Sequence, residues 1–160
     1  MANHFSNLTK AEWDQLCTAI PLIGILIAGA DGHIDDDEIE LSKKIAHIRS
    51  YKLQAGLKSY YQEVNTNFDG KFNEILQVLP TDLAERSQLI SQKLENLNLV
   101  LAKLETPLGA KLYQSFVSFA HHVAKASGGL MGFFSVNKAE AKWLELPMIN
   151  PIHFDISEEE

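Results

Sequence analysis

The chain has little of what marks several classes of protein. Cysteine is nearly missing: Cys17 is the single one among 160 residues, which excludes a disulfide framework and a cysteine-based zinc site. It lies within an apolar periodic pattern, so we expect a buried thiol in a reducing compartment. Basic residues are also few, 14 against 21 acidic ones, and the formal net charge is −7. Nucleic-acid binding needs clustered Lys and Arg, so we expect no nucleic-acid partner.

Long apolar runs are missing as well. The longest, at positions 19–30 (AIPLIGILIAGA), has twelve residues, whereas a bilayer takes about 20. The residues before it include Lys10, Glu12 and Asp14, which is unlike the positively charged start of a signal peptide. We therefore expect a buried core helix in a cytoplasmic protein.

Strand patterns are the third absence. No stretch alternates apolar and polar residues, whereas helix signals recur along the chain. With 46% hydrophobic and 22% charged residues, the composition is that of a globular domain. We expect one domain over positions 1–150, followed by an acidic tail at 151–160. The predicted fold is all-α, with about seven helices.

The first two helices carry the clearest signals. Positions 9–12 form a capping box, with Thr9 as N-cap and Glu12 reaching back. Pro21 predicts a kink or a break near Ala19. Asp35 is the expected N-cap of the second helix. The predicted buried faces are Leu16, Ile20, Ile23 and Ile27 in the first helix, and Leu41, Ile45 and Ile48 in the second.

Later helices follow from the same signals. A weaker pattern covers 51–65, and the polar residues at 65–70 indicate a loop. A short helix at 72–79 ends before Pro80, and the longest one runs from the Thr81 cap to about position 105. The next helix starts at Pro107 and buries an apolar stripe, and a last one is capped by Asn137. That stripe consists of Leu112, Phe116, Phe119, Ala120 and Val123.

Two segments of the chain match each other. Positions 20–32 align with 116–128 without gaps, and after a six-residue insertion 34–38 align with 136–140. One explanation is an internal duplication, which predicts two pseudo-symmetric halves with Ile34 and Val136 both buried. The other is that any two helix–turn–helix units share such signals. The residues alone leave both open.

The acidic segment after the first helix is the sharpest motif. It is similar to the second half of an EF-hand loop, with Asp31, Asp35 and Glu38 at loop positions 5, 9 and 12. Loop positions 1 and 3 fall on Ile27 and Gly29, which donate no side-chain oxygen. One interpretation is therefore a weak divalent-metal site completed by water. The other is that these acids only cap a helix.

Positions 28–40 read AGADGHIDDDEIE. This run resembles the TerB-like family, which is associated with tellurite resistance. The order of the helices and the second copy near 127–140 fit the same resemblance. The resemblance implies a compact helical domain of two pseudo-symmetric halves, which acts by binding in stress and metal-resistance systems. It also implies a metal site at Asp31, Asp35 and Glu38, for a divalent ion such as Ca²⁺, Mg²⁺ or Mn²⁺. The second copy departs from the pattern, with Ser127 in place of the acid.

Other motifs are less specific. The segment 128–134 (GGLMGFF) either contacts a protein partner or a membrane surface, or folds back onto the core. His121 and His122 are adjacent and do not share a helix face, so we do not expect a two-ligand metal clamp. No nucleophile motif, metalloprotease motif or phosphate loop occurs.

Three functions follow in order of preference. The first is a non-catalytic TerB-like binding or scaffold domain with a protein partner. The second is a structural interaction domain without metal, in which the acidic loop only caps helices. The third is an enzyme such as a metal-dependent hydrolase. The first two functions differ in one property: only in the first do folding or partner binding depend on a metal ion.

Overall fold

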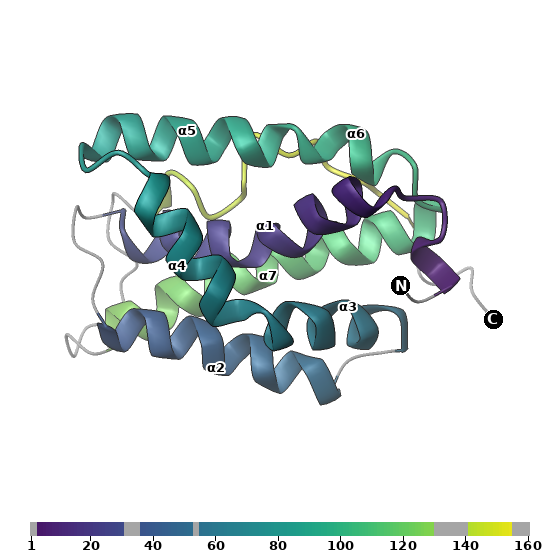
Figure 1. The fold of residues 1–160 in the computed structure, drawn as a ribbon, viewed down its shortest axis with the longest axis horizontal. Coiled ribbons are helices and arrows are strands. Elements are labelled where there is room, and N and C mark those ends of the chain that lie inside the picture. The colour runs from purple at the N-terminus through teal and green to yellow at the C-terminus, as the bar shows by residue number, and fades with distance from the viewer. Residues whose placement is uncertain (1–2, 31–35, 53–54, 130–140, 155–160) are drawn as a thin grey trace.

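The computed structural model describes residues 3–30, 36–52, 55–129 and 141–154 (Figure 1). These residues form α-helices and one 3₁₀ turn, with no strand among them, so the predicted all-α fold is confirmed. The elements are η1 (Asn3–Phe5), α1 (Lys10–Ala28), α2 (Asp36–Lys52), α3 (Ala55–Thr66), α4 (Phe68–Val78), α5 (Leu83–Glu95), α6 (Leu97–Leu101) and α7 (Thr106–Gly129).

Helix α1 is the centre of the bundle and contacts every other α-helix. Figure 1 shows α5 and α6 on one side of it and α2 and α3 on the other. From Leu16 to Ala28 every residue except Thr18 is buried, as expected for a helix that is apolar all round. In the described part of the chain, α1 alone is long and apolar enough to cross a membrane, a criterion that core helices also meet, and 67% of its apolar window is buried.

The start of α1 has the predicted capping box. The Thr9 backbone N–H donates to Glu12 Oε2 over 2.9 Å, and the Glu12 N–H donates to Thr9 Oγ1 over 3.2 Å. A hydrogen bond from Lys103 is the main cause that lowers the pKa of Glu12. The helix continues through Pro21 to Ala28. Of the two alternatives expected near Ala19, the break is therefore wrong, because packing on all sides of α1 outweighs the lost backbone hydrogen bond; the kink stays a prediction.

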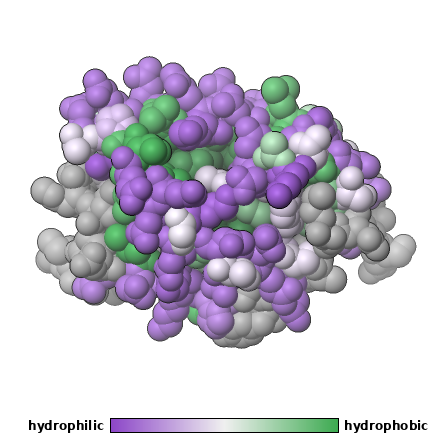
Figure 2. Space-filling model, viewed as in Figure 1, coloured by the Kyte–Doolittle hydropathy of each residue, from purple (hydrophilic) through white to green (hydrophobic). Residues whose placement is uncertain are grey.

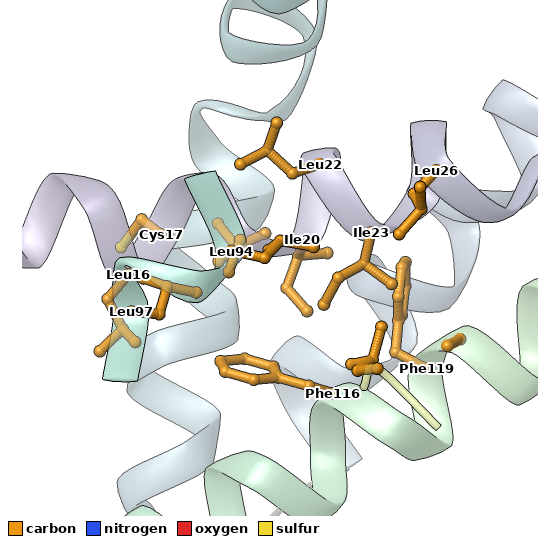
Figure 3. Close-up of a cluster of buried hydrophobic side chains, with 14 of the residues drawn as sticks. Leu16, Cys17, Ile20, Leu22, Ile23, Leu26, Leu94, Leu97, Phe116 and Phe119 are labelled. Carbon is orange, nitrogen blue, oxygen red and sulfur yellow. The ribbon is translucent and has the colours of Figure 1, made fainter. Parts of the chain in front are cut away.

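The core surrounds α1, and one of its main contacts is with α7. Ile20 and Ile23 of α1 point toward Phe116 and Phe119 of α7 (Figure 3), and all four side chains are fully buried. The two helices that a duplication would relate are thus neighbours. The turns that carry Ile34 and Val136 fall outside the described residues, and the duplication stays a prediction.

The buried face of α2 differs from the predicted one. Leu41, Ile45 and Ile48 are only half-buried, whereas the buried residues of this helix include Ser42, Ala46 and Arg49. The helix is therefore turned by one residue from the expected face. The reason is a close approach at Gly24 of α1, where a Cβ atom would lie 3.3 Å from the Ser42 hydroxyl oxygen. Small residues on both helices permit this contact.

Two predicted boundaries are also corrected. The loop expected at 65–70 is largely helical, since α4 begins at Phe68. Phe68 and Phe72 stack with ring centroids 5.7 Å apart and are buried, and this burial favours the helix over the polar local sequence. The N-cap of α5 is Asp82 rather than Thr81, and its carboxylate accepts from the Glu85 N–H.

The segment 141–154 packs along the bundle. Leu144, Leu146 and Ile149 are buried. Asn98 of α6 fixes the segment, since its amide donates to the Met148 carbonyl over 3.1 Å and its oxygen accepts from the Asn150 N–H over 2.8 Å.

Gly70 offers a direct test of the α4 boundary. It lies inside the helix, and no heavy atom lies within 4 Å of where its Cβ would stand. We expect Gly70→Ala to raise the free energy of unfolding by about 0.5–1 kcal/mol, because alanine loses less backbone entropy on folding. Urea denaturation measures the change. Gly24→Ala is the control and should give no such gain; a lower urea midpoint for Gly70→Ala would show that this segment is not helical.

Candidate functional site

The acidic loop joins α1 to α2. Helix α1 ends at Ala28 with Gly29 as its cap, and α2 begins at Asp36. Asp31 and Asp35 fall outside the described residues. Glu38 is the third residue of α2, and its side chain is likewise not described. The metal-ligand role of Asp31, Asp35 and Glu38 therefore stays a prediction. The start of α2 at Asp36 agrees with the expected N-cap at Asp35.

A buried arginine holds the end of α1. Arg86 of α5 is 8% exposed, and its guanidinium donates to the Gly29 carbonyl over 2.9 Å. The last carbonyls of a helix lack partners within the helix and carry a partial negative charge, which a cation satisfies. The chain thus enters the acidic loop from a point fixed to α5.

A groove of about 740 Å³ opens beside this point. It is lined by Ala30, by the first part of α5, and by Lys142 and Trp143. The Lys142 ammonium lies 4.7 Å from the Trp143 ring centroid. Hydrophilic residues cover most of the face in Figure 2, with hydrophobic ones gathered beneath α5. The α5 wall offers hydroxyls and amides, namely Ser87, Gln88, Ser91 and Gln92.

The two adjacent histidines of α7 have different partners. His121 Nε2 lies 2.9 Å from a carboxylate oxygen of Glu145. His122 Nδ1 lies 2.9 Å from the guanidinium of Arg49. Among the residues that the structure describes, no three His, Cys, Asp or Glu side chains are placed to hold one metal ion.

Arg49 is the centre of a polar cluster that the sequence interpretation missed. The side chain comes from α2 and is 8% exposed. Its Nη1 lies 3.0 Å from the Ser115 carbonyl and hydroxyl oxygens and 3.3 Å from the Tyr61 hydroxyl, so its two N–H groups are shared among three acceptors. Its NH2 group donates to the Ser118 hydroxyl over 3.0 Å and to His122 Nδ1. One side chain thereby joins α2, α3 and α7.

The hydrogen-bond partners of this cation are neutral groups, namely hydroxyls, a carbonyl and an imidazole. The rings of Tyr61 and Phe119 have centroids 5.6 and 5.7 Å from its guanidinium carbon, a cation–π arrangement. Burial is the main cause that raises the pKa of Tyr61, although Arg49 and Ser115 act against it. The tyrosine is therefore neutral.

The sequence of α7 contains a pattern that points to this polar cluster. Ser115, Ser118 and His122 follow at intervals of three and four residues, which places them on one helix face beside the apolar stripe. Their common partner lies 66 to 73 residues earlier in the chain, and nothing in the local pattern points to it.

Cys17 is buried, as predicted. Burial raises the pKa of its thiol to about 12, so the thiol stays protonated at neutral pH. The hydroxyl of Tyr60, on α3, donates to the carbonyl of Leu16, on α1, over 2.6 Å. Both groups contribute to the packing of α1 against α3.

Comparisons of the chain with protein-family models, with curated proteins and with solved structures returned no match.

Proposed function

We propose that this chain is a non-catalytic, TerB-like binding or scaffold domain, whose acidic loop takes a divalent cation with weak affinity. The observation that carries the proposal is the anchoring of both helices that flank the loop. Arg86 fixes the end of α1 to α5, and Arg49 fixes α2 to α3 and α7. A loop held by a rigid scaffold is the usual place for a binding site.

The donor set of the loop suits a hard cation. Asp31, Asp35 and Glu38 place three carboxylates within eight residues, and oxygen is the ligand that Ca²⁺, Mg²⁺ and Mn²⁺ prefer. The partial positive charge at the start of α2 and the guanidinium of Arg86 oppose the ion. We therefore expect a dissociation constant on the order of 10⁻⁴–10⁻³ M, at the weak end of such loops.

A protein partner belongs to the same proposal. The groove beside Ala30 lies next to the loop and presents an aromatic ring together with hydrogen-bonding side chains. The resemblance to TerB-like proteins connects such a domain to stress or tellurite resistance. The second candidate is a structural interaction domain whose acids only cap α2.

Calorimetric titration separates the two candidates. We expect heat of binding for Ca²⁺ or Mn²⁺ at millimolar concentration, and its loss in Asp31→Asn and Glu38→Gln. The matched control is Glu105→Gln, an exposed acid just before α7 at the other end of the bundle, which should bind like the unmodified protein. No heat at millimolar ion, or equal binding by all variants, would favour the interaction domain without metal.

A further inference from the structure

The contact between Arg49 and His122 fixes the protonation state of the histidine. An arginine side chain can only donate hydrogen bonds, so His122 Nδ1 accepts in the 2.9 Å contact. The imidazole is then neutral and carries its hydrogen on Nε2. A second proton would occupy the lone pair that now accepts from Arg49. The guanidinium would lose a partner and would face another cation.

The charged groups that act on His122 within the described residues do not relieve that conflict. His122 is flanked on α7 by His121 and Lys125, and it faces Arg49 of α2. The neutral Tyr61 of α3 shares Arg49 with it. Glu145 of the segment 141–154 is paired with the neighbouring His121. Partial burial is the largest cause that lowers the pKa of His122, followed by Arg49, Lys125 and His121.

We propose that His122 forms a proton-sensitive contact between α7 and α2, in which the hydrogen bond from Arg49 is lost when the imidazole takes a proton from solvent at Nδ1. The arginine is buried among hydroxyls, a carbonyl and aromatic rings, and His122 lies at the exposed edge of this cluster, where its ring can take a proton from solvent.

Linkage gives the direction of the pH effect. The unfolded chain has a histidine pKa of about 6.5, and the folded value is lower, so the unfolded chain binds more protons between the two values. The contribution of His122 to the free energy of unfolding is fully present above the pKa of the unfolded chain. It falls as the pH drops between the two pKa values, and it is constant again below the pKa of the folded protein. The folding equilibrium constant should fall about tenfold for each unit between the two pKa values.

Urea unfolding between pH 7.5 and 5 tests this contact. In His122→Asn, the amide oxygen replaces Nδ1 as acceptor and takes no proton in this range, so we expect a smaller loss of stability on acidification than in the unmodified protein. His121→Gln is the control, because it removes the neighbouring histidine and should leave the loss in place. Identical pH profiles for His122→Asn and the unmodified protein would overturn the proposal.

A second measurement avoids the need for a variant. Nitrogen NMR of the histidine rings in the unmodified protein reports both the tautomer and the pKa of His122. We expect the Nε2–H tautomer and a pKa below 6.5. A pKa of 6.5 or above, or a hydrogen on Nδ1 at neutral pH, would overturn the proposal.

Discussion

Arg49→Met is expected to lower the free energy of unfolding by about 3 kcal/mol. Methionine retains much of the side-chain volume, so the loss is mainly polar. The four N–H groups on the two terminal nitrogens of the guanidinium lose their contacts with five acceptor atoms, and a hydrogen bond to a charged group contributes about 1.5–3 kcal/mol. The variant no longer buries a cation, and this gain offsets part of the lost hydrogen-bond energy. The net loss of stability is still large, because the acceptors lie on two different helices.

Urea denaturation at pH 7.5 measures this effect. Arg86→Met is the matched comparison, because Arg86 is equally buried and, within the described part of the chain, its guanidinium donates one hydrogen bond, to the Gly29 carbonyl. We expect it to cost about 1–2 kcal/mol, less than Arg49→Met. An Arg49→Met protein as stable as the unmodified one would mean that the guanidinium does not hold the three helices together.

Phe116→Ala should have the largest effect of all, a loss of about 3–5 kcal/mol. Phe116 is fully buried between α7 and α1, with its ring centroid 6.1 Å from that of Tyr60. Truncation removes the transfer free energy of the ring and leaves a cavity against α1, which is packed on all sides and cannot move to fill it.

Thermal or urea denaturation tests this value against an exposed residue. Leu99→Ala truncates an apolar side chain of α6 that is 76% exposed, and its effect should stay within about 0.5 kcal/mol. A Phe116→Ala protein that loses no more than Leu99→Ala would place the core elsewhere in the molecule.

The sequence predicts some helices well for a simple physical reason. The apolar residues of α1 and α7 are so dense that the local pattern and the tertiary packing agree, and Ile20, Ile23, Phe116 and Phe119 are buried as expected. In α2 the pattern misleads. Its apolar residues are only half-buried, whereas Ser42 and Arg49 are buried. Ser42 is buried because Gly24 of α1 leaves room for its small side chain.

The polar cluster could not be predicted in the same way. Its members come from α2, α3 and α7, and the pattern of each helix shows only that a polar residue borders an apolar stripe. The pairing of Arg49 with Ser115 and His122 depends on how the helices meet, which local periodicity does not specify. By contrast, the acidic loop is local in sequence, so its candidate ligands are predicted without knowledge of the fold, and they stay a prediction.

The weak metal site in this loop is the central functional claim, and anomalous scattering tests it most directly. Crystals grown with Mn²⁺ should show an anomalous peak between the end of α1 and the start of α2, with carboxylate oxygens of Asp31 and Glu38 among its ligands and water completing the shell. A structure in millimolar Mn²⁺ with no peak at this loop, or with the ion bound only elsewhere, would contradict the account.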